Sequence, residues 1–358
     1  MSRIRVGIIG QGRSGRDIHG EYLAKDDRFQ IVAVADELAD RQRRAAEEYG
    51  CQAYGDYRKM LRRGDLDLVV NASYSFQHAA VTLAVLKAGI NCLTEKPFAT
   101  RARDVDRMIA AAARSGKLLA VYQQSRYAPY FQQVRKVIDS GVLGRIVQVS
   151  IAFNGFARRW DWQTLTEFGG GNLLNTGPHP LDQALQLFGT DTMPQVTCCM
   201  DRAVTWGDAE DHVHLTLRGE GRPLIVLEIS SCCAYPCFTY NVYGTQGGLK
   251  AGTTHADWKY FLPAEAPPQQ LRREPICKPD GTPAYCREKL TWHEGSWNNP
   301  TEGQDLFHSM SASFYNMLYR SLTEGAPLEI TPQQVRQQIA VIELCRKQNP
   351  HIYGRKKA

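Results

Sequence analysis

Lys96 and His179 are the residues of this sequence best suited to move a proton. Lys96 stands in the triplet Glu95-Lys96-Pro97, which ends an apolar run, and His179 follows a run of three glycines. Imidazole titrates near neutral pH, so His179 is the best candidate for a general base. A lysine beside another positive charge has a lowered pKa and can exchange a proton with a substrate hydroxyl. The alternatives are a surface lysine at a strand end and a structural histidine.

Two further polar residues accompany His179. Asn175, His179 and Asp182 are spaced at i, i+4 and i+7, which on a continuous helix would place them on one face. Pro178 and Pro180 disfavour an unbroken helix. We therefore expect Asn175 just before a break and the main helix from near Pro180 to 188.

The chain opens with a strand pattern that runs into the glycine motif G-x-G-x-x-G. Gly10 would allow a tight turn, Gly12 would let the backbone approach a pyrophosphate, and Gly15 would let a helix pack close to the sheet. The helix N-terminus offers free N–H groups to phosphates. The same loop contains three further expected cofactor-binding residues, Gln11, Arg13 and Ser14.

The second apolar run, Ile31 to Ala35, ends on Asp36. This acid follows the last glycine by about 20 residues, the spacing of the carboxylate that binds the adenosine ribose hydroxyls. A carboxylate there would repel a 2′-phosphate. The sequence therefore predicts a dinucleotide site that favours NAD over NADP.

Strand and helix patterns alternate over residues 1–124, which predicts an α/β domain with a parallel sheet and helices on both faces. The expected strands are 4–9, 30–35, 66–73, 90–98 and 118–124, and the expected helices are about 13–25, 38–49, 76–88 and 101–115. A chain of 358 residues favours two domains. This first domain is the expected dinucleotide-binding domain.

Residues 125–358 have longer β-like runs, which predict an α+β domain with a largely antiparallel sheet. The expected strands are 145–154, 195–204, 211–218, 223–231 and 237–243, and the expected helices are about 128–140, 180–188, 303–323 and 332–347. The segment 251–300 is rich in proline and carries Trp258, Trp292 and Trp297. It is either a surface loop or a lid or oligomer arm.

The chain leaves the first domain through Gln123, Gln124, Arg126 and Tyr127, where an interdomain crevice is expected to open. We expect Gln124 at the cofactor, and Arg126 and Tyr127 as hydrogen-bonding partners of a polyol substrate. The ordinary alternative is a salt bridge within the linker.

Composition excludes several classes of protein. The net charge of +6 is modest and spread along the chain, which is not typical of nucleic-acid binding. No apolar stretch has the length of a membrane span, and the first strand begins too early for a signal peptide. We expect a cytoplasmic protein with no nucleic-acid or membrane partner.

The ten cysteines form no C-x-x-C pair, so we expect buried free thiols. His212 and His214 would share one strand face, but no third ligand can be assigned. A structural role is favoured for both, and no metal site is predicted.

These motifs in this order resemble the GFO/IDH/MocA (glucose–fructose oxidoreductase / inositol dehydrogenase) family. The resemblance rests on the glycine motif, the E-K-P triplet, the glycine run with its downstream histidine, and GTQGGL at 244–249. It implies a Rossmann-type domain followed by a domain with an open, mostly antiparallel sheet. It also implies homo-oligomers and sugar or cyclitol substrates.

The resemblance also implies roles for residues. Members use a lysine, an aspartate and a histidine in catalysis, which here become Lys96, Asn175 and His179; these would also bind substrate. Asparagine cannot take a proton, so Asn175 would only position its neighbours. The remaining expected cofactor contacts are Ser73, Tyr74, His78, Glu95 and Lys96.

The sequence thus predicts an NAD-dependent oxidoreductase that oxidises a secondary hydroxyl, such as the one at C3, of a sugar, glycoside or cyclitol. A member of this kind would resemble a glycoside 3-dehydrogenase. One alternative is a redox-assisted glycoside hydrolase that holds NAD tightly and gives no net NADH. A further alternative is a non-catalytic, NAD-binding regulatory protein.

Overall fold

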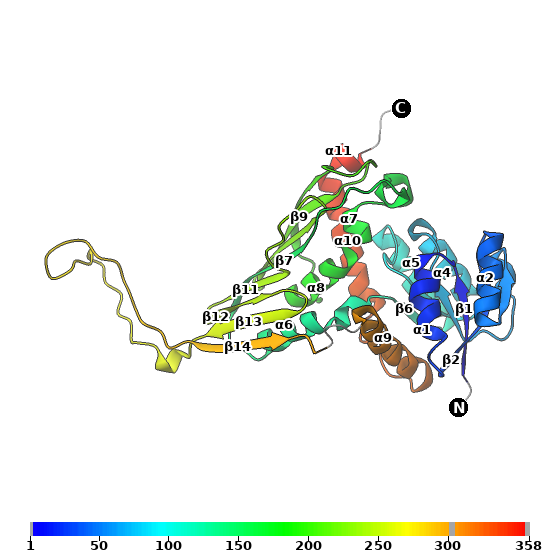
Figure 1. Ribbon diagram of the computed structural model, residues 1–358, viewed down its shortest axis with the longest axis horizontal. Coiled ribbons are helices and arrows are strands. Elements are labelled where there is room, and N and C mark those ends of the chain that lie inside the picture. The colour runs from blue at the N-terminus through cyan, green and yellow to red at the C-terminus, as the bar shows by residue number, and fades with distance from the viewer. Residues whose placement is uncertain (1–2, 301–304, 355–358) are drawn as a thin grey trace.

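The computed structural model describes residues 3–300 and 305–354. Figure 1 shows two sheets with helices α6 (Pro129–Asp139), α8 (Pro178–Phe188) and α10 (Pro332–Gln348) between them. The first sheet has the strand order β3-β2-β1-β4-β5-β6, and the second has the order β14-β13-β12-β11-β7-β10-β9-β8. The predicted fold class is confirmed.

All strands of the first sheet are parallel. They are β1 (Ile4–Ile9), β2 (Phe29–Ala35), β3 (Gln52–Tyr54), β4 (Leu68–Asn71), β5 (Asn91–Thr94) and β6 (Leu119–Val121). Helices α2 (Ala39–Tyr49), α4 (His78–Lys87) and α5 (Ala102–Ser115) connect them. The central strands are buried along nearly their whole length, as helices on both faces require. This strand order is that of the Rossmann fold, whose ligands bind beyond the carboxyl ends of the strands.

The second sheet is antiparallel except that β7 pairs in parallel with β10 in the described part of the chain. Its strands are β7 (Ile146–Asn154), β8 (Gln195–Asp201), β9 (His212–Arg218), β10 (Leu224–Ser230), β11 (Tyr240–Gly244), β12 (Gly247–Ala251), β13 (His255–Tyr260) and β14 (His293–Asn298). Buried residues alternate with half-buried or exposed ones along β9 and with half-buried ones along most of β10, because only one face packs on helices.

The segment 251–300 is not a single excursion. Its two ends form β13 and β14, which pair with each other and extend the sheet. Trp258 and Trp297 pack against the core, while Trp292 is 45% exposed. The chain between β13 and β14 projects away from the first sheet (Figure 1). This direction rules out a lid over the interdomain region, and a role as an oligomer arm stays a prediction.

The C-terminal helices return to the first domain. Helix α9 (Leu306–Thr323) covers the region predicted as a helix over 303–323, of which residues 303–304 lie outside the described residues. On this helix, Tyr315 lies edge-on to Phe29 of β2 at 5.6 Å between ring centroids. Among the described helices, none combines the length and apolar character that crossing a membrane requires.

The cysteines are all free, but they are not all buried as expected. Cys92, Cys198 and Cys345 are buried, whereas Cys199 is exposed. The difference between Cys198 and Cys199 follows from strand geometry, since neighbouring residues of β8 face opposite sides and one face of this sheet is uncovered.

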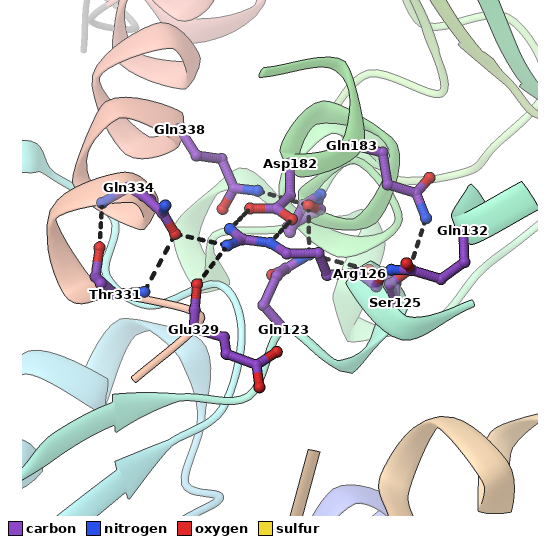
Figure 2. Close-up of polar contacts among 11 residues, drawn as sticks. Gln123, Ser125, Arg126, Gln132, Asp182, Gln183, Glu329, Thr331, Gln334 and Gln338 are labelled. Atoms are coloured by element: carbon purple, nitrogen blue, oxygen red, sulfur yellow. Dashed lines mark hydrogen bonds and ion pairs between the residues drawn. The ribbon is translucent and has the colours of Figure 1, made fainter. Parts of the chain in front are cut away.

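A buried ion pair joins the end of the first domain to α8. Arg126 donates to both carboxylate oxygens of Asp182, at 2.9 and 2.6 Å. Their side chains are 6% and 2% exposed. The Arg126 guanidinium also donates to the side-chain oxygen of Gln334 on α10 at 2.5 Å, as Figure 2 shows. Arg126 thus forms a salt bridge, as in the alternative for this residue, but the partner lies on α8 and not within the linker.

The same junction holds the start of α8. The side-chain amides of Gln123 and Gln338 both donate to the carbonyl oxygen of Pro178, at 2.8 and 2.5 Å. The Gln183 amide donates to the carbonyl of Ser125 at 2.7 Å. Bonds to the first and sixth residues of α8 fix both its position and its rotation against the end of β6.

Replacing Asp182 with alanine should lower the free energy of unfolding by about 3–5 kcal/mol, because the buried guanidinium of Arg126 loses its counter-charge. Asp106→Ala is the matched control, since Asp106 pairs with Arg336 of α10 where both side chains are at least 41% exposed. That change should cost less than about 1 kcal/mol. Urea unfolding measures both variants, and equal losses would contradict the account of the junction.

Candidate active site

A cleft of about 1050 Å³ opens beyond the carboxyl ends of the first sheet's strands. It brings together residues that lie far apart in the sequence and were predicted from separate motifs. The predicted site residues that line it are Gly10, Gly12, Arg13, Ser14, Asp36, Ser73, Tyr74, His78, Glu95, Lys96, Gln124, Asn175 and His179.

Four predicted residues do not line the cleft. Gln11 is buried and its backbone N–H donates to Asp36, while Gly15 packs beneath Gly10. Arg126 is used by the buried ion pair, and the Tyr127 hydroxyl donates to Glu329 at 2.8 Å. The positions of Arg126 and Tyr127 therefore do not support the prediction that they bind substrate.

The glycine motif forms a tight cradle. Gly10 has a φ of 88°, and a Cβ there would lie 2.3 Å from the carbonyl oxygen of Ala72. A Cβ on Gly15 would lie 1.8 Å from the carbonyl oxygen of Gly10. A Cβ on Gly12 would meet only the Arg41 side chain, at 3.7 Å. Gly10 and Gly15 are thus required by the fold, whereas Gly12 keeps open a space that fits a pyrophosphate.

The helix after the cradle is wider than expected. The region predicted as an α-helix over 13–25 has π-type winding in η1 (Ser14–Gly20) and becomes α-helical only in α1 (Glu21–Leu23). Gly20 lies so close to the Tyr49 hydroxyl that a Cβ would come within 2.2 Å of it. Close packing at Gly15 and Gly20 accompanies this local change of winding.

Asp36 lines the end of the cleft that we predict binds adenosine. Its carboxylate accepts hydrogen bonds from the backbone N–H groups of Gln11 at 2.7 Å and Leu38 at 2.9 Å. The guanidinium of Arg41 lies 3.5 Å away. The carboxylate is held in place beside the glycine cradle, as a group that binds ribose hydroxyls must be.

Glu95 is held by a buried network that the sequence did not reveal. Its carboxylate lies 3.2 Å from His19 Nε2, and His19 Nδ1 lies 2.6 Å from the Tyr315 hydroxyl. Burial raises the pKa of Glu95, but the hydrogen bond and charge of His19 and the charge of Lys96 outweigh it and lower this pKa to about 2. The Glu95 carboxylate also accepts from the Lys96 backbone N–H at 2.8 Å. Glu95 thus fixes the backbone from which the lysine extends.

Lys96 is positioned by the segment that carries Asn175. The lysine Nζ donates to the backbone carbonyl oxygen of Asn175 at 3.0 Å. The Asn175 side-chain amide donates to Gln163 at 3.4 Å. Burial lowers the pKa of Lys96, the charge of Glu95 opposes this, and the charge of Arg13 lowers the pKa further. Asn175 therefore contacts Lys96 through its backbone carbonyl. Either asparagine or aspartate can make this contact.

His179 stands at the start of α8, which begins at Pro178 after the short helix α7 (Asn172–Asn175). The predicted break between the two is confirmed. Burial, together with the charge of Lys96, lowers the pKa of His179 to about 3. Its Nδ1 is buried without a hydrogen-bond partner among the described residues. The neutral imidazole thus has a ring nitrogen open to a hydrogen bond from a ligand, while the lowered pKa makes it a weaker base than an exposed histidine.

His78 has a structural role in addition to lining the cleft. Its Nδ1 lies 2.7 Å from the Pro97 carbonyl oxygen, and its Nε2 lies 3.0 Å from that of Ser73. Burial lowers the pKa of His78, so the neutral ring donates one of these bonds at a time. His78 links the turn after β5 to the loop after β4.

Sequence reasoning missed several residues of the cleft wall. Arg159, Asp161 and Gln163 line it from the irregular stretch between β7 and α7. Arg41 and Arg58 line its adenosine end. No periodicity or motif marks these positions, so only the folded chain places them.

The strand order, the glycine cradle and the acid directly after β2 are those of a dinucleotide-binding Rossmann domain. A family model described as the oxidoreductase family with an NAD-binding Rossmann fold matches residues 4–123, and the GFO/IDH/MocA C-terminal domain matches residues 131–250. The chain therefore belongs to the GFO/IDH/MocA family, as its motifs predicted.

Similar proteins include sugar and cyclitol dehydrogenases. Scyllo-inositol 2-dehydrogenase (NADP(+)) IolW of Bacillus subtilis (strain 168) is 26% identical over 96% of this chain and 93% of that protein. D-glucoside 3-dehydrogenase of Escherichia coli (strain K12) is 31% identical over 54% of this chain and 57% of that protein. The crystal structure of the WlbA dehydrogenase from Bordetella pertussis, in complex with NADH and UDP-GlcNAcA, has a TM-score of 0.77 at 21% identity over 98% of this chain and 96% of that chain.

Gly12→Ala should leave the fold intact and weaken cofactor binding at least about tenfold, because its Cβ fills the space that the pyrophosphate needs. Calorimetry gives the affinity for NAD and thermal unfolding gives Tm. Gly64→Ala is a control for the loss of a glycine, since nothing lies within 4 Å of its added Cβ and its φ is outside the left-handed region. An unchanged affinity in Gly12→Ala would refute the cradle.

The lowered pKa of His179 means that the imidazole is neutral at pH 7 and gains its proton only near pH 3. NMR of the histidine side chains should therefore show no titration of His179 between about pH 5 and 8. His255 provides the contrast, because hydrogen bonds to Asn298 and Asp257 raise its pKa above 6.5. The His179→Gln variant assigns the signal, and a midpoint near 6.5 for that signal would disprove the prediction.

Proposed function

We propose that this protein is an NAD-dependent oxidoreductase that oxidises a secondary hydroxyl of a sugar, glycoside or cyclitol. The observation that carries the proposal is one cleft lined by the glycine cradle, by Lys96 and by His179. The names of the two dehydrogenase relatives support the substrate class. NAD, when bound, supplies the carbon that accepts the hydride.

Lys96 and His179 divide the work at the reacting hydroxyl. His179 has a neutral imidazole at pH 7 and accepts the hydroxyl proton as the carbonyl forms. Lys96, held at the Asn175 carbonyl, donates a hydrogen bond to the same oxygen and stabilises its developing negative charge. The neutral imidazole is the form that the surroundings of His179 favour. At Lys96, burial lowers the pKa and the charge of Glu95 opposes that lowering.

Asp36 favours NAD over NADP in this proposal, because its carboxylate would repel a 2′-phosphate. Arg41 favours NADP instead, because its guanidinium lies 3.5 Å from that carboxylate and a cation there can bind a phosphate. Binding of NAD and of NADP is therefore measured side by side, with Arg41→Ala as the variant that separates the two effects.

Lys96→Met and His179→Asn should each lower kcat about 10²–10⁴-fold at saturating NAD, since each removes a group that moves or stabilises charge at the hydroxyl. The assay follows NADH formation on a panel of glucosides and inositols, with 3-deoxy-glucosides to test oxidation at C3. Tyr127→Phe is the control, because its hydroxyl contacts Glu329 outside the cleft, and it should keep wild-type turnover.

Three results would overturn parts of this proposal. Wild-type turnover in His179→Asn would exclude the imidazole as the base. Cleavage of a glycoside with no net NADH would replace net oxidation by redox-assisted hydrolysis. Tight NAD binding without reaction on any member of the panel would favour a regulatory protein.

A further inference from the structure

Four aromatic side chains, two of which line the cleft, contact one another in a closed circuit. Tyr74 stacks on Phe76 at 5.7 Å between ring centroids, and lies edge-on to Trp162 at 5.4 Å. Phe168 contacts Phe76 at 6.0 Å and Trp162 at 6.4 Å. The first two rings follow β4 in the first domain, and the other two precede α7 in the second. We name these four residues the aromatic circuit.

The circuit is open to solvent on one side. Tyr74, Phe76 and Trp162 are 46%, 45% and 40% exposed, although apolar rings of this size are usually covered. Tyr74 and Trp162 line the cleft, whereas Phe76 and Phe168 support them from behind. Because the two lining rings contact each other, a ligand can pack on their cleft-facing surface but not between them.

The aromatic circuit is connected to Lys96 through Asn175 and Gln163. The Lys96 Nζ bonds to the Asn175 carbonyl at 3.0 Å, and the Asn175 amide reaches Gln163 at 3.4 Å. Trp162 directly precedes Gln163 in the chain. The cleft wall thus changes from polar groups that suit sugar hydroxyls to aromatic rings that suit an apolar, planar group.

We infer that the aromatic circuit binds the aglycone of the substrate, and that the preferred substrate is a glycoside with a planar aromatic aglycone. This inference rests on the proposed function, since it assumes that the sugar reacts at Lys96 and His179. The aromatic ring packs on Tyr74 and Trp162 while the sugar extends inward. The tryptophans of 251–300 play no part in this site, because Trp258 and Trp292 line a separate hollow at the edge of the second sheet.

The test compares phenyl and methyl β-glucoside with NAD-saturated protein. Stacking on the circuit should favour phenyl glucoside about tenfold in kcat/KM and in Kd. Trp162→Ala should lose this preference, so that the ratio of kcat/KM for phenyl over methyl glucoside falls from about ten to about one. Trp162→Phe, which keeps an aromatic face, should retain most of the preference. Trp160→Ala is the matched control, because Trp160 is 80% exposed and does not line the cleft.

Each outcome decides the inference. Equal losses on both glucosides in Trp162→Ala would overturn it and make the circuit a latch between domains. A wild-type protein without preference for the phenyl group would overturn it as well, and would favour a free sugar or cyclitol. If neither glucoside yields NADH, the proposed function fails, and the Kd values alone then decide the aglycone site. Tighter binding of phenyl glucoside than of methyl glucoside would support the site. Equal binding of the two, or no binding, would reject it.

Discussion

The geometry of the cleft depends on how α8 is attached to the end of the first sheet. The Pro178 carbonyl accepts hydrogen bonds from Gln123 of the first domain and Gln338 of α10, and the Arg126–Asp182 pair holds the next turn of the same helix. His179 lies between these two anchors. Since a bidentate buried ion pair tolerates little movement, the junction sets where the imidazole meets the lysine that follows β5.

A second constraint is electrostatic. Lys96 and His179 line one partly buried cleft, and burial favours the neutral form of both. The positive charge of Lys96 further lowers the pKa of His179, whereas Glu95 opposes the lowering at both residues. Glu95 stays ionised because His19 contacts it and Tyr315 contacts His19. The carboxylate of Glu95 thus opposes, at both bases, the loss of positive charge that burial favours.

Local patterns predicted the first domain well, because a strand, a glycine turn and an acid after the next strand are close in sequence and each has one geometric reason. Local patterns also singled out Lys96 and His179, which the fold brings to one cleft, and predicted the break before Pro178. The sequence did not reveal the His19–Glu95–Tyr315 network, since its members come from three distant elements. Arg126 was expected to bind substrate, but the fold brings a carboxylate from α8 against it. Strands β12 to β14 escaped notice because glycines and an inserted segment hide their alternation. The domain boundary, the homo-oligomer and the individual site roles stay predictions.

The central claim is that one substrate oxygen meets both the amine of Lys96 and the imidazole of His179 in a cleft that also holds the dinucleotide. A crystal structure with NAD and a glycoside bound tests this most directly. The account predicts that Lys96 Nζ and one His179 ring nitrogen each lie within about 3.2 Å of the same sugar hydroxyl oxygen. A sugar whose hydroxyls all lie beyond hydrogen-bond reach of both groups, or a dinucleotide bound away from Gly12, would contradict it.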